Sequence, residues 1–426
     1  MQFKVEAFHN PYLPPDTRRV DAIVTVNAQD DGTMTRGRAG RTSTEALILD
    51  VSGSMQGERL ISVKNAARKA IELLDEDTLF FVIAFNHEAG LVYPLTRATP
   101  TNKHTAAEAV KRLVAGGSTR LSSGLALARQ EFGKAPNTIR HALFLTDGKN
   151  APEDEAQLQT ALYQSEGMFQ CDCRGVGTDW QPSQLRAIAQ KLLGSAQIIP
   201  DPKGLEDDFR ATLQNALSRG VGDVRLRLWT PKTARVMTCK QMSPDIIDLT
   251  ARGTQIDAQT YEYPTGAWGS ESRDYYAAIE IEPGTPGDEM LTCRASIIYS
   301  DNGNEVKSAP AMVLATWTED EGLSARIEPQ VAHYTGQEEL AETIRLGLEA
   351  RSRGDAREAT ARLGRAVQLA HDSGNSETTR RLQKVVDVVD AESGTVRLKA
   401  GVHKADEMDL DLMSTRTRRA GPPPTA

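Results

Sequence analysis

Residues 46–57 read Ala46-Leu-Ile-Leu-Asp50-Val-Ser52-Gly-Ser54-Met55-Gln-Gly57, an apolar run that ends in one carboxylate and two hydroxyls. The apolar run predicts a short buried strand, and the glycines after it allow a sharp turn. The residues that follow predict a helix, because apolar side chains recur at helical spacing at Leu60, Val63, Ala67, Ala70, Ile71 and Leu74. Asp50, Ser52 and Ser54 therefore stand where a strand ends and a helix begins, which is where ligands bind in open α/β sheets.

Two later segments add further oxygen atoms at comparable places. Thr119 follows two glycines and precedes a helical pattern, and Asp147 follows the apolar strand candidate at 141–146. The full set of candidates shares hard oxygen ligands and consists of Asp50, Ser52, Ser54, Thr119 and Asp147. Hydroxyls, carboxylates and retained waters suit Mg²⁺ or Mn²⁺. The set holds no histidine or thiol, which argues against zinc.

In these segments the chain resembles the von Willebrand factor type A family with a complete metal-ion-dependent adhesion site, over about residues 41–219. The resemblance implies that Ser52, Ser54 and Thr119 ligate the metal directly. It implies that Asp50 and Asp147 act largely through waters, and that an acidic side chain of a partner protein completes the coordination. We therefore expect a protein-binding module that captures an Asp or Glu of its partner, not an enzyme.

Loops around the metal motif are expected to select that partner. The candidate contact residues are Met55, Gln56, Ser118, Arg120, Lys149 and Trp180. Trp180 follows the strand candidate at 169–176, at the same end as the metal motif, and could present an aromatic ring to a partner. A competing interpretation is a ring folded over the start of the next helix.

Two other functions stay open for the same site. A Mg²⁺-dependent hydrolase or phosphotransferase would need a general base beside the metal, and the motifs supply none besides Asp50 and Asp147. A scaffold with a purely structural metal would lose stability as well as binding when Asp50 is replaced. The layout of the chain resembles cytoplasmic bacterial type A proteins of signalling or stress systems, which favours a binding role in such an assembly.

The composition bounds the class of protein. Of 426 residues, 39% are hydrophobic and 25% are charged, which is typical of a globular protein. The formal net charge of −8 argues against a general nucleic-acid binder. No run approaches the ~18 apolar residues of a membrane span, and the first residues lack the apolar core of a secretory signal. Four cysteines make no disulfide framework, so we expect a cytoplasmic protein.

The chain predicts an α/β domain with a doubly wound, mostly parallel sheet, which is inserted in a β-sandwich. Residues 42–219 alternate strands with helices and form that α/β domain. Residues 1–35 carry two strand candidates, and residues 221–317 are strand-like with a hairpin turn at 301–304. The N-terminal strands have no place in the middle pattern, so we expect them to pair with the later strands.

Helices and a tail are predicted for the rest of the chain. Residues 325–392 predict a three-helix region, with the last helix over 377–389. Residues 393–426 lack apolar periodicity and contain Pro422–Pro424, which predicts a disordered tail.

This predicted tail carries two candidate phosphorylation sites, Thr415 and Thr417, between arginines. A phosphate added by a Ser/Thr kinase would bring about −1.5 to −2 charge and strong acceptor oxygens. A phosphothreonine-reading forkhead-associated domain is then a candidate partner. Two alternatives are that the acidic run at 406–411 offers its carboxylates to a metal site, or that the tail only aids solubility.

Three other candidates for chemistry are interpreted as core residues. Cys171 and Cys173 point to one face of a strand, and no second cysteine pair lies near them in the sequence. His141 opens a strand and lacks a catalytic motif, so packing is the expected role.

Overall fold

The computed structural model describes residues 1–30, 42–301 and 303–419. They form two compact units: an α/β unit (42–223 with 266–269) and a β/helix unit (1–30, 224–265 and the described residues from 270 to 419). Residues 36–41, whose sequence Arg-Gly-Arg-Ala-Gly-Arg predicts a connector between domains, lie outside the described residues. Within the described ranges, no helix combines the length and the apolarity that crossing a membrane requires.

The α/β unit contains one sheet with the strand order β6-β5-β4-β7-β8-β9. All neighbours pair in parallel except β5 and β6, which are antiparallel. The strands are β4 (Ser43–Asp50), β5 (Leu79–Phe85), β6 (Ala89–Arg97), β7 (Ile139–Thr146), β8 (Gln170–Val176) and β9 (Ala196–Ile199). Strand β6 lies at an edge, as its proline predicts, because proline cannot donate to a second neighbour.

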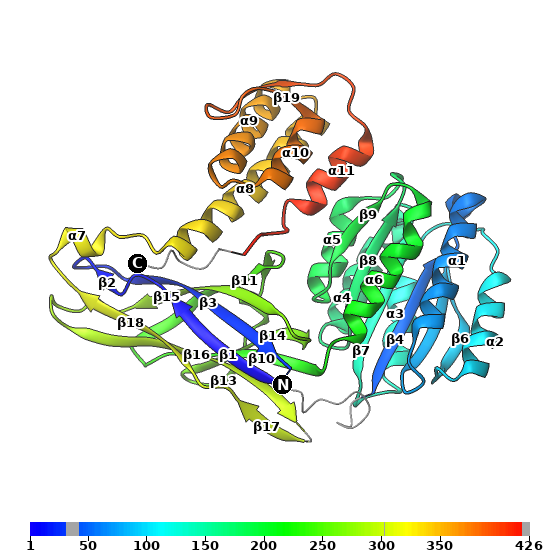
Figure 1. The fold of residues 1–426 in the computed structure, drawn as a ribbon, viewed down its shortest axis with the longest axis horizontal. Helices are drawn as coiled ribbons and strands as arrows, with labels where there is room; N and C mark the ends of the chain where they lie inside the picture. Colours follow the sequence, from blue (N-terminus) through cyan, green and yellow to red (C-terminus); the bar gives the residue numbers. More distant parts are fainter. Residues whose placement is uncertain (31–41, 302, 420–426) are drawn as a thin grey trace. The chain divides into compact units, whose positions relative to one another are not determined.

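Helices cover both faces of this sheet (Figure 1). They are α1 (Glu58–Leu73), α2 (Pro100–Lys111), α3 (Leu121–Phe132), α4 (Glu155–Ser165), α5 (Pro182–Lys191) and α6 (Leu205–Leu217). Leu47 and Leu49 of β4 belong to a core cluster with side chains of α1, α2 and α6. Ile48, between them, faces Gly124 of α3 on the other side. This alternation is the period of two that a strand imposes, and the predicted α/β fold with a mostly parallel sheet is confirmed.

The sequence before Gly116 predicts a helix over about 105–114, and helix α2 begins five residues earlier, at Pro100. The reason is local: the Asn102 N–H donates to the Thr99 hydroxyl at 3.3 Å, and Pro100 occupies the first helical position. A threonine cap followed by proline is a helix start that the apolar spacing does not reveal.

The β/helix unit contains two sheets, with the strand orders β1-β3-β15-β11-β12 and β13-β14-β10-β16-β18-β2. Strand β17 (Asn304–Lys307) pairs with β16 outside the second order. The strands of the first sheet are β1 (Gln2–Phe8), β3 (Arg19–Gln29), β15 (Ser272–Ile281), β11 (Ala234–Ser243) and β12 (Ile247–Asp248). Those of the second are β13 (Thr254–Asp257), β14 (Thr260–Trp268), β10 (Val221–Trp229), β16 (Glu289–Asp301), β18 (Ala311–Trp317) and β2 (Tyr12–Leu13).

The N-terminal strands pair with the later strands, as expected. Strand β3 is antiparallel to β15, with Asn27 opposite Ser272. Phe3 of β1 packs on Tyr299 of β16, with 5.1 Å between the ring centroids, so the two sheets touch there. The predicted hairpin turn joins β16 to β17 with Asp301 opposite Asn304, and residue 302 lies outside the described residues.

Beyond the sheets, the chain forms α7 (Glu321–Ser324), α8 (Pro329–Ser352), α9 (Ala356–Asp372) and α10 (Ser376–Val385). The helix predicted to reach Val389 was wrong at its end. Helix α10 stops at Val385, and β19 (Val386–Asp390) pairs with β20 (Thr395–Leu398). The valines at 386, 388 and 389 favour a strand once a partner strand is at hand, which is a tertiary effect.

The disordered tail predicted for 393–426 was wrong for the described part, residues 393–419. Strand β20 and helix α11 (Lys404–Met413) lie there, and α11 buries Met408, Leu410 and Leu412. Leu410 joins the core cluster that α8, α9 and α10 form. These few apolar residues are enough because the three helices already present a surface to bury them. Residues 420–426 lie outside the described residues.

The candidate phosphorylation sites lie in the segment that follows α11. The Thr417 side chain is buried, and its hydroxyl donates to the Met242 carbonyl. Thr415 donates to the Leu412 carbonyl at 3.2 Å, and Arg419 donates to Asp274 at 3.1 Å. A kinase would have to detach this segment from the sheet before it could reach Thr417, so the disorder on which the phosphorylation hypothesis depended is absent.

Candidate metal centre

The first three candidate ligands lie at the carboxyl end of the central strand of the α/β unit. Asp50 is the last residue of β4, and the 3₁₀ turn Gly53–Met55 follows. Gly57 has a φ of 86°, which favours glycine, and α1 begins at the next residue. The strand, tight turn and helix start predicted from residues 46–57 are the local structure found.

The other two candidates come to the same place from neighbouring loops. Thr119 precedes α3, and Asp147 follows β7, which pairs with β4. A Cβ atom at Gly148 would lie 2.6 Å from the Thr119 hydroxyl oxygen and 3.4 Å from that of Ser54. Glycine at 148 therefore allows the three loops to meet, and all five predicted side chains gather at one edge of the sheet.

Hydrogen bonds connect four of these five residues, Asp50, Ser52, Ser54 and Asp147. The Ser52 N–H donates to Asp50 Oδ1 at 2.7 Å, and the Thr146 hydroxyl donates to Asp50 Oδ2 at 2.5 Å. The Ser52 and Ser54 hydroxyl oxygens lie 3.1 Å apart. Ser54 donates to Asp147 Oδ1 at 2.6 Å. The hydroxyls and carboxylates are thus oriented toward one another before any ion is considered.

Burial makes the negative charges of this cluster unfavourable. Asp50 and Asp147 are both fully buried. Burial raises the pKa of Asp50 to about 6, against the lowering effect of its hydrogen bonds, and the charge of Asp147 adds to the rise. Two buried carboxylates this close favour a bound cation, because a cation stabilises the charged form of both.

The donor set fits a hard divalent ion. It offers two carboxylates and three hydroxyls, the oxygen ligands that Mg²⁺ and Mn²⁺ accept together with waters. Among the described residues, no group of three or more His, Cys, Asp or Glu side chains is arranged so that it could hold a metal ion. A metal site with histidine or thiolate ligands is therefore not found in the described part of the chain. The candidate that this part contains is an oxygen site with two carboxylates.

Four of the six predicted partner-contacting residues are exposed: Gln56, Ser118, Arg120 and Lys149. The other two predictions were wrong. Met55 is fully buried in the core cluster on the α1 side of the sheet. Trp180 is 1% exposed, and its indole N–H donates to the Gly177 carbonyl at 3.0 Å. Its ring occupies the space that a side chain at Gly175 would fill, so the competing interpretation of Trp180 as a packed ring is the right one.

One charged residue at the centre was missed. Arg59, in the first turn of α1, donates to Asp147 Oδ2 at 2.6 Å and to Asp179 Oδ2 at 3.0 Å. Its guanidinium therefore joins the loop after β7 to the loop after β8. The signal available in the sequence was its place directly after the metal motif, but the two carboxylates that it pairs with lie 88 and 120 residues away.

A second charged cluster lies at the amino ends of the same strands. His141 is 1% exposed and lies between two carboxylates, with Nδ1 2.7 Å from Glu45 and Nε2 2.9 Å from Asp172. Burial by itself lowers the pKa of His141, but the charge of Glu45 and the hydrogen bonds to both carboxylates outweigh it and raise the pKa to about 8. Burial raises the pKa of Asp172, and His141 more than reverses this, so that pKa is lowered.

His141 is thus packed and paired, as expected. Cys171 and Cys173 are also buried, with 3.9 Å between their sulfur atoms and no disulfide between them.

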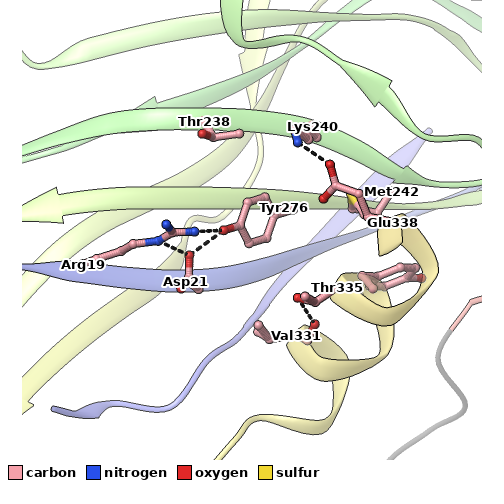
Figure 2. A pocket seen from close by; sticks show the side chains of 10 residues that line it. Arg19, Asp21, Thr238, Lys240, Met242, Tyr276, Val331, Thr335 and Glu338 are labelled. Atoms are coloured by element: carbon pink, nitrogen blue, oxygen red, sulfur yellow. Dashed lines mark hydrogen bonds and ion pairs between the residues drawn. The ribbon is translucent and has the colours of Figure 1, made fainter. Parts of the chain in front are cut away.

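The β/helix unit has a cavity of about 300 Å³, lined by strands β3, β11 and β15 and by helix α8 (Figure 2). Arg19 donates to Asp21 at 2.8 Å and to the Tyr276 hydroxyl at 2.6 Å. Lys240 forms an ion pair with Glu338 of α8. Each cation in the lining already has a carboxylate partner, so the metal centre is the stronger candidate for a functional site.

Comparisons with known sequences agree with this geometry. A model of the von Willebrand factor type A domain matches residues 46–198, which contain all five candidate ligands. A model of the von Willebrand factor type A C-terminal domain matches residues 368–414, which contain β19, β20 and α11.

Two solved structures resemble the whole chain. A von Willebrand factor type A protein from Catenulispora acidiphila is 42% identical, with a TM-score of 0.93 over 98% of this chain and 97% of that one. The ArnB paralog VWA2 from Sulfolobus acidocaldarius shares the fold at 15% identity, with a TM-score of 0.61 over 98% of each chain.

Curated relatives share a part of the chain. An uncharacterized protein of Synechocystis is 34% identical over 211 residues, which are 48% of this chain and 50% of that protein. The human voltage-dependent calcium channel subunit alpha-2/delta-3 is 26% identical over 189 residues, which are 38% of this chain and 17% of the subunit. The chain thus spans half or less of the length of these two relatives.

Proposed function

Because this chain belongs to the von Willebrand factor type A family, we propose that it is a binding module that holds a partner protein through a divalent cation. The ion is Mg²⁺ or Mn²⁺, and the partner presents an Asp or Glu to it. The observation that carries the proposal is the meeting of Asp50, Ser54 and Asp147 with two further hydroxyls at one edge of the sheet.

In this proposal the five side chains have two roles. Ser52, Ser54 and Thr119 ligate the ion directly through neutral hydroxyls, and Asp50 and Asp147 act largely through waters. When bound, such an ion would supply a concentrated positive charge to which a carboxylate of the partner would be attracted. Neutral ligands leave much of the ionic charge uncompensated, which favours an anionic partner.

Specificity would come from the exposed rim of the site. Arg120 and Lys149 are cations beside the candidate ligands, and Gln56 and Ser118 offer hydrogen bonds. In the part of the chain that the structure describes, the carboxylate paired with Arg120 is the distant one of Glu153, at 4.0 Å, so the charge of Arg120 is available to an acidic partner. We place this capture in a bacterial signalling or stress-response assembly, on the strength of the layout of the chain.

The test is capture of partners from the native cell by the full chain, in Mg²⁺ and in EDTA. Thr119→Ala removes one proposed ligand and should abolish the metal-dependent partners. Thr105→Ala, on the exposed surface of α2, is the matched control and should keep them. A set of partners that ignores both EDTA and Thr119→Ala would exclude metal-mediated capture.

The same proteins separate the two alternative functions. Turnover of phosphoesters that needs Mg²⁺ and disappears in Asp147→Ala would favour a hydrolase or phosphotransferase. A scaffold with a structural metal predicts that Asp50→Ala lowers the melting temperature as much as it lowers partner capture, which a thermal melt beside the capture experiment measures.

A further inference from the structure

Arg59 is the feature of the metal centre that the metal ligands do not explain. It is the cation that pairs with a candidate ligand among the described residues, through Asp147 Oδ2 at 2.6 Å. Asp50, the other carboxylate, accepts from neutral donors, which include the Ser52 N–H and the Thr146 hydroxyl. One of the two buried negative charges is therefore already compensated from within the chain.

The position of Arg59 suits this compensation. Its side chain is 30% exposed, whereas that of Asp147 is fully buried. The second guanidinium nitrogen pairs with the more exposed Asp179 at 3.0 Å. Arg59 thus reaches the buried carboxylate from the solvent side of α1 and is held there by a carboxylate on the next loop.

A divalent ion and Arg59 make conflicting demands on the site. Both are attracted to the Asp147 carboxylate, and they repel each other, because like charges at short range are unfavourable in a partly buried site. Each therefore lowers the other's net interaction with Asp147. In a site without an ion, the guanidinium compensates part of the negative charge that the ion would otherwise compensate.

We infer that Arg59 is a resident countercharge that stabilises the ion-free site and sets the affinity for the divalent ion by competing for Asp147. This inference rests on the proposed function, since it concerns the same ion. It assigns Arg59 a role opposite to that of a ligand: removing it should tighten metal binding and weaken the ion-free fold. A residue that merely positions Asp147 would give the reverse result for the metal.

The experiment measures Mg²⁺ binding to the full chain by calorimetry, with MgCl₂ as the probe. Arg59→Gln should bind Mg²⁺ about tenfold more tightly than the wild type, which is about 1.4 kcal/mol. Arg59→Lys keeps the charge and should stay within about twofold of the wild type. Asp179→Asn leaves the Arg59 charge less compensated and should weaken Mg²⁺ binding about threefold.

Thermal melting in EDTA gives a readout that does not involve the metal. Without an ion, Arg59→Gln should lower the Tm of the α/β unit by about 2–4 °C, because Asp147 loses its countercharge. Added Mg²⁺ should then raise the Tm more in Arg59→Gln than in the wild type.

The outcomes separate this inference from the proposed function. A wild type that binds no Mg²⁺ removes both. A wild type that binds Mg²⁺, with equal or weaker binding in Arg59→Gln, leaves the metal site intact and overturns the role of Arg59. If Mg²⁺ affinity rises in Arg59→Gln, falls in Asp179→Asn and changes little in Arg59→Lys, Arg59 is established as a charge that competes with the ion.

Discussion

Strands β4 and β7 carry charged side chains at both ends, and the two ends compensate those charges differently. At the amino ends, Glu45 and Asp172 of the neighbouring β8 enclose His141, with both ring nitrogens in contact with a carboxylate. At the carboxyl ends, Asp50 and Asp147 face hydroxyls, and Asp147 alone of the two pairs with Arg59 in the described part of the chain. Both clusters are buried, but only the first holds its cation inside the core.

This difference teaches how one sheet can hold a structural cluster at one end and a candidate binding cluster at the other. A buried carboxylate needs a countercharge or hydrogen bonds, because burial penalises its charge. At the amino ends, His141 meets that need from within the core. At the carboxyl ends the compensation is partial, and the pKa of Asp50 stays raised, at about 6. A cation from solution can compensate the carboxylate charge that the chain itself leaves uncompensated.

The largest effect is expected for His141→Ala. It leaves Glu45 and Asp172 buried without their shared cation, and breaking a buried pair by removing one partner costs about 3–5 kcal/mol. Urea denaturation of the full chain measures the loss. Exposed His104→Ala on α2 is the matched control. Mg²⁺ affinity should stay within about twofold, because distant sites are usually independent; a tenfold change would show that the two ends are coupled.

The next effect is the loss of Mg²⁺ binding in Asp50→Ala, which we expect to be at least about 100-fold, or about 2.7 kcal/mol. In EDTA this variant should be as stable as the wild type, because the charge that it removes is disfavoured by burial. Calorimetry and melting measure the two quantities, with exposed Asp77→Ala as the control. A large loss of stability of Asp50→Ala in EDTA would show that the carboxyl-end cluster has a structural role, like the cluster around His141.

The pH dependence of stability should come from the amino-end cluster. The pKa of His141 is raised to about 8 in the folded chain from 6.5, so its contribution is complete below about pH 6.5 and is lost as the pH rises through about 8. The shift corresponds to about 2 kcal/mol. Urea denaturation between pH 6 and 9 should show this loss in the wild type and not in His141→Ala. A flat profile would mean that His141 is neutral between the carboxylates.

The smallest effect compares one hydroxyl at each end. Thr146→Val removes the hydrogen bond to Asp50 Oδ2 and should weaken Mg²⁺ binding about fivefold, or about 1 kcal/mol. Thr44→Val removes a bond of similar length to Thr138, 2.7 Å, at the amino end of β4. Thr44→Val should lower the free energy of unfolding by about 1 kcal/mol. It should leave the Mg²⁺ affinity unchanged. Equal effects of both variants on Mg²⁺ would contradict the separation of the two ends.

The metal-centre residues could be predicted because their signals are local. A buried strand, a carboxylate, spaced hydroxyls and a helix start lie within residues 46–57, and parallel strands bring their carboxyl ends to one edge of a sheet. The same reasoning placed Thr119 and Asp147 beside Asp50. The burial of Met55 and Trp180 could not be predicted in this way, because it depends on which cavity each side chain meets in the folded unit.

What the sequence determined by itself is the alternation of strands and helices in the α/β unit, the edge position of β6 and the meeting of the five candidate ligands at the carboxyl edge of the sheet. Each follows from short-range periodicity or from proline and glycine geometry. Tertiary structure alone decided that α11 would fold, that His141 would lie between Glu45 and Asp172, and that Arg59 would reach Asp147. In these cases the deciding partner is remote in sequence: a few apolar side chains or a single charge become ordered only when a distant segment supplies a surface or a countercharge.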